Sequence, residues 1–123
     1  MTHKQKVLSI IIPAFNEENT IALILDRVCK AELPLEIGKE IIVVNDYSTD
    51  KTADAVKKYL EANPSVPIQY IEHSVNKGKG AALHTGIAKA TGNYLIIQDA
   101  DSEYNPDEYA ILLTPITSGF ADV

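Results

Sequence analysis

Four short runs of apolar residues, rich in Ile and Val, alternate with segments whose apolar side chains recur every three or four positions. The runs are Val7–Ile12, Glu40–Val44, Ile68–Glu72 and Tyr94–Ile97. Such runs are typical of strands buried on both faces of a parallel sheet, and the longer spacing is typical of amphipathic helices. The alternation therefore predicts an α/β fold of three layers, with helices on both faces of an open, mainly parallel sheet.

Helical patterns follow each of the first three predicted strands. Their expected buried positions are Ile21, Ile24, Leu25 and Val28, then Ala53, Val56 and Leu60, then Leu83, Ile87 and Ala90, with Gly92 as the stop of the third helix. A fourth helix is predicted over Pro106–Leu113, and Ala121-Asp122-Val123 resembles the start of a further strand. We therefore expect one domain over residues 1–123 that forms part of a longer fold.

Charge and hydropathy exclude several classes of protein. A hydrophobic content of 46% and a charged content of 23% are ordinary for a folded domain. The net charge is −6 and no basic run exceeds a pair such as Lys57-Lys58, which argues against a nucleic-acid partner. The longest apolar run, Val7–Ile12, is too short to cross a membrane, so we expect a cytoplasmic chain. The single Cys29 excludes an internal disulfide and is predicted to be buried on its helix.

Polar segments follow all four predicted strands. They are Pro13–Glu17, Asn45–Ser48, Ser74–Gly80 and Asp99–Glu103. Because the carboxyl ends of parallel strands lie at one edge of a sheet, and ligands of open α/β sheets bind beyond that edge, these segments predict a binding site there. The opposite edge receives ordinary connecting residues.

Asp99, Asp101 and Glu103 place three carboxylates at alternate positions after the last run. Neighbouring carboxylates repel one another unless a cation or full solvation relieves the repulsion, and Mg²⁺ or Mn²⁺ would do so while still accepting phosphate oxygens. A solvated loop, or capping of the next turn by Asp101, explains the pattern equally well. Both readings stay open at this point.

Two further segments have residues that are typical of a nucleotide-binding site. Asp46 ends the second strand, where a carboxylate can bond a ribose or a base edge, whereas Ser48, Thr49 and Asp50 read as a turn and a helix cap. Gly78-Lys79-Gly80 precedes a helix and could approach phosphate. The spacing is neither G-x-G-x-x-G nor a P-loop, and no G-x-S-x-G is present, so a nicotinamide enzyme, a P-loop NTPase and a hydrolase are disfavoured.

Four motifs in order resemble the family 2 glycosyltransferases of the GT-A fold, and especially the dolichol- or polyprenyl-phosphate mannosyltransferase branch. The motifs are Ile10-Ile11-Ile12-Pro13-Ala14-Phe15-Asn16-Glu17-Glu18, Val43-Val44-Asn45-Asp46-Tyr47-Ser48-Thr49-Asp50, Asn76-Lys77-Gly78-Lys79-Gly80-Ala81-Ala82 and Gln98-Asp99-Ala100-Asp101. The resemblance implies inverting transfer of a sugar from a nucleotide diphosphate donor, with Mg²⁺ or Mn²⁺, by a chain whose residues 1–123 are the donor-binding part.

The resemblance also assigns roles by position. It implies that Pro13, Phe15 and Glu17 line the nucleoside pocket, that Val44 and Asp46 meet the base or ribose, and that Asp99 and Ala100 flank the ribose and diphosphate. Asp101 would be the principal metal ligand, in a metal set of Asp99, Asp101 and Glu103. Lys77 or Lys79 would reach a phosphate.

Two departures from the family pattern bear on function. Asn45-Asp46 stands where family members commonly have Asp-Asp, so the first position is expected to serve the turn alone. The acceptor-binding half is expected to lie beyond Val123, so no general base is assigned. The implied acceptor is a lipid phosphate or a glycan hydroxyl, and membrane contact, at the cytoplasmic face, would come from regions outside this chain.

Two functions other than sugar transfer were compared with the motifs. A receiver domain fits them less well than the transferase does, and a nucleotide-binding fragment fits them equally well. A phosphoacceptor receiver domain has a similar length, but it should place an acidic pair after the first strand, where this chain has Pro13-Ala14-Phe15. A nucleotide-binding fragment without turnover has the same motifs as the transferase. Sugar transfer to a lipid phosphate would separate the fragment from the enzyme.

Overall fold

The computed structural model describes residues 6–34 and 37–100. Its strands are β1 (Lys6–Ala14), β2 (Ile37–Asn45), β3 (Ile68–Glu72) and β4 (Tyr94–Ile97), and its helices are α1 (Ile21–Lys30), α2 (Thr52–Ala62) and α3 (Lys79–Lys89). The predicted alternation of strands and helices is confirmed throughout this part of the chain. The helix predicted over Pro106–Leu113 and the strand start at 121–123 lie outside the described residues.

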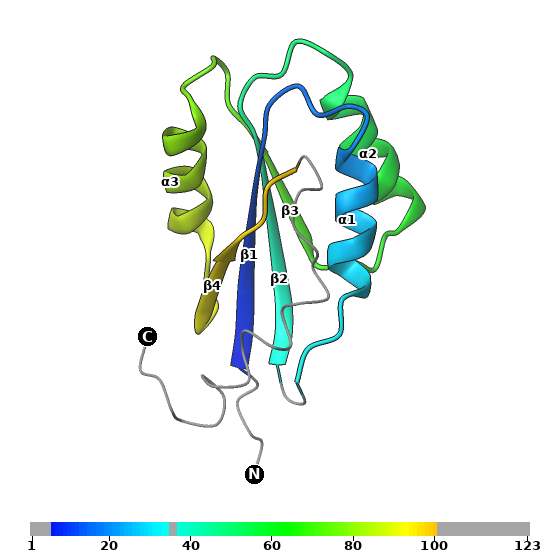
Figure 1. Cartoon of the computed structure of the whole chain (residues 1–123), viewed down its shortest axis with the longest axis vertical. Coiled ribbons are helices and arrows are strands. Elements are labelled where there is room, and N and C mark those ends of the chain that lie inside the picture. The colour runs from blue at the N-terminus through cyan, green and yellow to red at the C-terminus, as the bar shows by residue number, and fades with distance from the viewer. Residues whose placement is uncertain (1–5, 35–36, 101–123) are drawn as a thin grey trace.

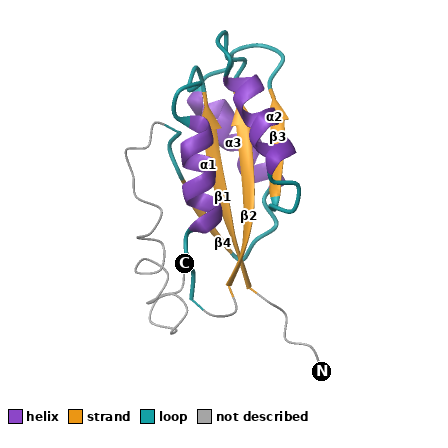
Figure 2. Ribbon diagram, turned by 90° about the vertical axis from the view of Figure 1, so that its right-hand side faces the viewer, coloured by secondary structure: helices purple, strands orange, loops and turns teal. Residues whose placement is uncertain are grey.

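The four strands form a parallel sheet in the order β3-β2-β1-β4. Helices α1 and α2 lie side by side on one face, and α3 covers the other face, where it contacts β1 and β2 (Figures 1 and 2). The three-layer arrangement predicted from the sequence is confirmed. The loops after β1, β2 and β3 gather at the top of the view in Figure 1, which is the carboxyl edge of the sheet.

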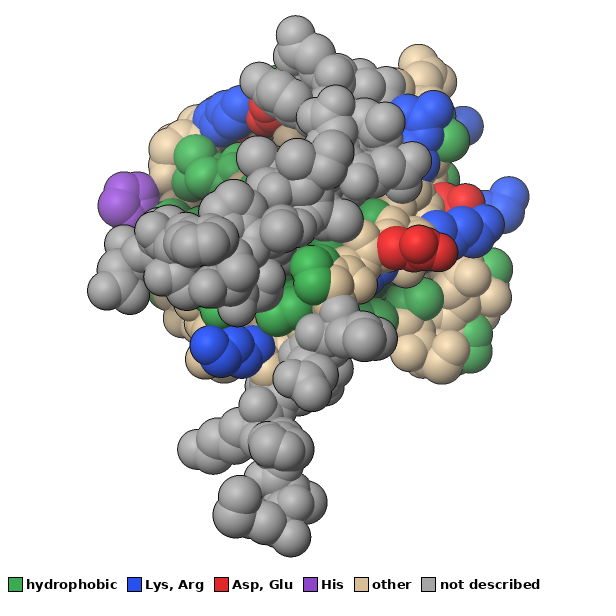
Figure 3. Space-filling model, turned by 60° about the horizontal axis from the view of Figure 1, so that its bottom comes forward, with side chains coloured by type: hydrophobic (Ala, Val, Ile, Leu, Met, Phe, Trp, Pro, Cys, Tyr) green, Lys and Arg blue, Asp and Glu red, His purple; other side chains and the backbone are tan. Residues whose placement is uncertain are grey.

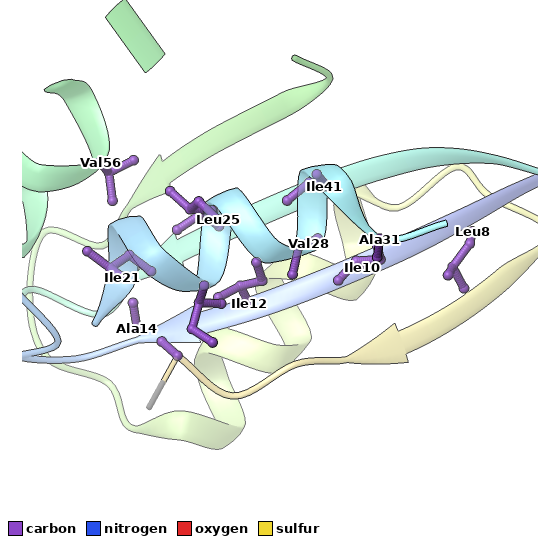
Figure 4. Close-up of a cluster of buried hydrophobic side chains, with 13 residues drawn as sticks. Leu8, Ile10, Ile12, Ala14, Ile21, Leu25, Val28, Ala31, Ile41 and Val56 are labelled. Carbon is purple, nitrogen blue, oxygen red and sulfur yellow. The ribbon is translucent and has the colours of Figure 1, made fainter. Parts of the chain in front are cut away.

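The larger core lies between the sheet and α1. Figure 4 shows Ile21, Leu25 and Val28 of α1 facing Ile10 and Ile12 of β1, and all five side chains are fully buried. Removing apolar surface from water stabilises this layer by about 25 cal/mol per Å². Cys29 was predicted to be buried among them, but it is a half-buried free thiol at the margin of this core.

The central and edge strands differ in burial. Residues 41–45 of β2 and 8–14 of β1 are buried on both faces, as the sequence predicts. In β3 and β4 the prediction is wrong for the described part of the chain, where both lie at the edges of the sheet and their burial alternates or stays partial. Leu95 and Ile97 of β4 are exposed.

Helix α3 packs through only part of the face that its apolar spacing predicts, since Leu83 and Ala90 are partly buried against the core. Its buried residues are Ala82 and Gly86, whereas Ile87, a predicted core position, is exposed. A Cβ added at Gly86 would lie 2.4 Å from Ile11 Cγ2, so the missing side chain allows the helix to approach the sheet closely. Gly92 was predicted to stop α3, but the helix ends at Lys89, and Gly92 instead fits against β1, where an added Cβ would lie 2.5 Å from Ser9 Oγ.

Polar side chains fasten the amino edge of the sheet. Buried Ser9 donates its hydroxyl to Glu40 Oε1 at 2.7 Å and accepts the N–H of Gly92 at 2.9 Å. Thr91 donates its N–H to Glu40 Oε1 at 2.8 Å and its hydroxyl to Oε2 at 2.6 Å. Both carboxylate oxygens of Glu40 therefore accept bonds that join β1, β2 and the turn before β4.

Glu40→Gln is expected to lower the free energy of unfolding at neutral pH by about 1–2 kcal/mol, because the new amide would face a hydroxyl or N–H donor. Burial alone would raise the pKa of Glu40, but the bonds from Thr91 and Ser9 outweigh it and hold the pKa below its ordinary 4.5. This stabilisation is present above pH 4.5 and is lost as the pH falls through the folded-state pKa. Urea unfolding of both proteins at pH 7 and pH 3 checks this, and a difference independent of pH would contradict it.

Two further surface features bear on function. None of the helices in the described part of the chain has the length and apolar content needed to cross a lipid bilayer. On the face shown in Figure 3, the visible basic and acidic side chains lie interspersed among apolar and neutral ones.

Candidate functional site

A cavity of about 360 Å³ opens at the carboxyl edge of the sheet. Its wall consists of Pro13, Ala14, Phe15, Glu17, Asp46, Asn76, Gly78, Lys79, Ala82, Asp99 and Ala100. These residues come from all four polar segments that follow the strands and from the start of α3. The prediction that the four segments meet at one edge is therefore confirmed.

The loops after β1 and β2 are tied together by hydrogen bonds. Asn16 accepts the N–H of Thr49 at 2.8 Å through Oδ1 and donates its own N–H to Ser48 Oγ at 2.9 Å. Asn16 has φ of 54° and Tyr47 has φ of 57°. Both values lie in the left-handed region, which residues other than glycine rarely adopt. The N–H of Glu17 also donates to Thr52 Oγ1 at 2.8 Å. These bonds hold Phe15 and Glu17 at the cavity wall.

Asn45 serves the turn, as the sequence led us to expect. Its Oδ1 accepts the N–H of Ser48 at 3.0 Å and its Nδ2 donates to the Tyr70 hydroxyl at 2.9 Å. Asp50 Oδ1 accepts the N–H of Thr52 at 2.9 Å, where α2 begins. The predicted turn is confirmed, but the predicted cap is not, because the N-cap of α2 is Lys51, which makes no side-chain capping bond. Asp50 lies one residue before the cap.

Asp46 is 3% exposed, and its carboxylate accepts three hydrogen bonds. Oδ1 accepts from His73 Nδ1 and from the N–H of Lys77, each at 2.8 Å, and Oδ2 accepts the N–H of Gly78 at 2.8 Å. Burial alone would raise the pKa of Asp46, but the bonds from His73, Lys77 and Gly78 outweigh it and lower the pKa. Asp46 is therefore ionised at neutral pH and holds the loop before α3 in place.

The N-terminus of α3 faces the cavity. Gly78, with φ of 94°, precedes the helix, and no side chain caps its first turn. Gly78, Lys79 and Ala82 all line the wall. Uncapped N–H groups and the helix dipole make such an end a favourable place for a phosphate.

A single ion pair crosses the cavity wall among the described residues. Lys79 Nζ lies 2.6 Å from Asp99 Oδ1, and the Asp99 side chain is 24% exposed. Asp99 thus already attracts a cationic group at this position, and its hard oxygens fit Mg²⁺ or Mn²⁺. Within 6–34 and 37–100 no three His, Cys, Asp or Glu side chains gather closely enough to share an ion. Asp101 and Glu103, the other predicted metal ligands, lie outside the described residues.

The structure brings most of the predicted site residues together. Those on the wall are Pro13, Phe15, Glu17, Asp46, Asp99 and Ala100. Val44 is not on the wall, because its side chain is fully buried beneath α3 with Ile42 and Ala82. Lys77 is exposed and reaches the site through its backbone N–H, whereas Lys79 is on the wall.

Sequence reasoning missed two residues of the site. Asn76 lines the wall and donates its Nδ2 to the Asp46 carbonyl at 3.3 Å. His73 bonds Asp46 on the side away from the cavity, and none of the four motifs includes it. Its position directly after β3, at the edge where the ligand was expected, was the available signal.

Comparisons with known proteins agree with this geometry. The sequence profile of the family described as Glycosyl transferase family 2 matches residues 9–123. A dolichyl-phosphate beta-glucosyltransferase of Dictyostelium discoideum is 37% identical over 99 residues, which cover 76% of this chain and 30% of the relative. A dodecaprenyl-phosphate galacturonate synthase of Rhizobium johnstonii is 29% identical over 89% of this chain and 32% of the relative.

Among solved structures, a mannosyltransferase from Pyrobaculum calidifontis in complex with GDP-Man and Mn²⁺ superposes with a TM-score of 0.77 at 28% identity, covering 90% of this chain and 33% of that one. S. aureus TarS in complex with UDP-GlcNAc gives a TM-score of 0.78 at 27% identity, covering 94% and 32%. The chain thus spans about a third of the length of the proteins it resembles.

Proposed function

The chain belongs to the family 2 glycosyltransferases, with a GT-A fold, and on that premise we propose that its cavity binds the donor of the transfer, a nucleotide diphosphate sugar. The sugar then passes, with inversion, to an acceptor such as a polyprenyl phosphate or a glycan hydroxyl. If the acceptor is a polyprenyl phosphate, we propose that the transfer takes place at the cytoplasmic face of a membrane.

One observation carries the proposal: a single cavity unites an aromatic side chain, a buried carboxylate and the start of a helix. Phe15, 45% exposed at the wall, offers a ring on which a base can stack. Asp46 can accept a hydrogen bond from the base or ribose. The diphosphate would then lie near the N-terminus of α3 and Lys79.

The proposed metal site is at the other side of the same cavity. Asp99 would hold Mg²⁺ or Mn²⁺ together with Asp101 and Glu103. When bound, the ion stabilises the negative charge that develops on the leaving diphosphate. Lys79 would shift from Asp99 towards a phosphate oxygen, since both groups attract its ammonium. Relatives solved with Mn²⁺ and sugar nucleotides support this assignment.

Titration calorimetry of the chain with UDP and with GDP tests the proposal. We expect binding of at least one nucleotide in the presence of Mn²⁺ and weakening by about tenfold or more when EDTA removes the ion, because the phosphates then face Asp99 without a bridging cation. Asp99→Asn should reduce the difference between the two conditions. Asp54→Asn, on the exposed surface of α2, is the matched control and should behave as wild type.

Two outcomes would contradict the proposal in different ways. If neither nucleotide gives a heat of binding, the proposal that the cavity is a donor site is wrong. Equal heats with Mn²⁺ and with EDTA would leave a nucleotide site but exclude the metal bridge.

A further inference from the structure

His73 contacts three different parts of the fold. Its backbone N–H donates to the Asn45 carbonyl at 2.9 Å, which extends the pairing of β2 and β3 by one step. Its ring, in a side chain only 6% exposed, lies 2.8 Å from Asp46 Oδ1 through Nδ1 and 2.8 Å from Thr85 Oγ1 through Nε2. Thr85 belongs to α3. Both ring nitrogens are therefore used, which a histidine kept only for packing would not require.

The bond to Asp46 fixes the proton on the ring. An ionised carboxylate can only accept, so Nδ1 carries the hydrogen and donates it to Oδ1. In the neutral ring Nε2 is then an acceptor, and the Thr85 hydroxyl donates to it. The chain of bonds therefore runs from α3 through the ring to the carboxylate.

Asp46 has one acceptor position left for a ligand. A carboxylate offers about four acceptor positions. Oδ1 uses two of them for His73 and the N–H of Lys77, and Oδ2 uses one for the N–H of Gly78. Among the described contacts this leaves one position on Oδ2, and Asp46 lines the cavity. Without His73, Oδ1 would also be available and the carboxylate could rotate away from this arrangement.

We propose that His73 is a positioning residue of the nucleotide site: by occupying Oδ1 of Asp46 it orients the carboxylate so that Oδ2 bonds the nucleotide. The inference rests on the function proposed above. His73 acts through Asp46, since it is not on the cavity wall itself.

Thr85, His73 and Asp46 also have the order of a hydroxyl, base and carboxylate in a hydrolytic triad. That role is disfavoured by placement. Neither Thr85 nor His73 lines the cavity, so the hydroxyl is not presented to a substrate there. The same three side chains are well placed to fix the position of α3 and the loop at residues 76–78.

Two substitutions of His73 separate positioning from packing. His73→Asn places an amide nitrogen near the position of Nδ1 and keeps a donor to Asp46, whereas His73→Gln places its amide near Nε2 and keeps only the partner in Thr85. We expect the nucleotide that wild-type protein binds, UDP or GDP, to bind His73→Asn in the presence of Mn²⁺ within about threefold of its wild-type affinity. Binding to His73→Gln should weaken by about tenfold or more, since a hydrogen bond to a charged group is lost.

Thermal unfolding of the same proteins supplies the second readout. His73→Gln should melt at a lower temperature than His73→Asn, because it loses the bond to the buried carboxylate. A positioning role predicts that the two variants differ in nucleotide affinity at a temperature where both are shown to be folded. Equal losses of affinity in both, or wild-type affinity in both, would overturn the inference. Wild-type protein that fails to bind UDP or GDP would instead count against the proposed function.

Thr85→Ser and Thr85→Val provide a further pair should the His73 variants fail to fold. Serine keeps the hydroxyl that donates to Nε2, and valine keeps the shape without it. We expect weaker UDP binding for the valine variant alone. Identical affinities for the two would overturn the inference.

Discussion

Asp46→Asn should abolish measurable nucleotide binding and lower the free energy of unfolding by about 2–4 kcal/mol, because buried donors would lose their acceptor. Asparagine has nearly the same shape as aspartate, but one of its two oxygens is replaced by an NH₂ group. In either orientation that NH₂ group would face the N–H of Gly78 or the donors from His73 and Lys77. The loop before α3 would then lose its fixed position, and the cavity wall would change with it.

Urea unfolding followed by circular dichroism, together with UDP and GDP calorimetry, measures both effects. Asp54→Asn makes the same chemical change on the exposed surface of α2. It should leave nucleotide binding unchanged and cost only the roughly 0.3–1 kcal/mol that a carboxylate contributes in the first turn of a helix. Wild-type stability in Asp46→Asn would show that the three bonds contribute little. Wild-type affinity in a destabilised variant would show that Asp46 supports the fold without touching the nucleotide.

Gly86→Ala should destabilise the chain by about 1–3 kcal/mol, although alanine normally favours a helix over glycine by about 1 kcal/mol. The new Cβ would lie 2.4 Å from Ile11 Cγ2, well inside contact distance, and 3.5 Å from Val44 Cγ2. Ile11 and Val44 are both fully buried and have no open space to move into. Helix α3 would have to shift away from the sheet, and its N-terminus at the cavity would shift with it.

Gly80→Ala is the matched control, because an added Cβ at Gly80, in the same helix, meets nothing within 4 Å. It should be neutral or slightly stabilising in urea unfolding. Ile11→Ala combined with Gly86→Ala should give a smaller loss than the sum of the two single changes, since the double variant removes the clash. Equal stability of Gly86→Ala and Gly80→Ala would contradict the close approach.

The sequence predicts the elements well because their signals are local. β3 and β4 have the predicted bounds, and every predicted helix in the described part is present. The face that each helix buries depends less on local sequence. In α3 the predicted positions Leu83 and Ala90 do pack against the core, but Ile87 is exposed, and the small residues Ala82 and Gly86 make the closest approach to the sheet. Such an approach depends on Ile11, 75 positions earlier in the chain, so no pattern within the helix reveals it.

The candidate site divides in the same way. Residues at the carboxyl ends of strands could be assigned to one edge, and Phe15, Glu17 and Asp46 do lie on one cavity wall. The hydrogen-bond partners behind that wall could not be assigned, since only the three-dimensional packing brings His73 to Asp46 and Thr85 of α3 to His73. The metal-ligand roles of Asp101 and Glu103 stay predictions.

The strand order has a consequence for how the chain is made. β1 lies between β2 and β4, and its Leu8 is paired with Tyr94. During synthesis on the ribosome, β1, β2 and β3 can associate while β4 has yet to be translated, because contacts between distant positions form late. Until then one flank of β1 has open backbone N–H and carbonyl groups. A nascent chain in which β4 has yet to form should therefore depend on chaperones more than one in which β4 is paired with β1.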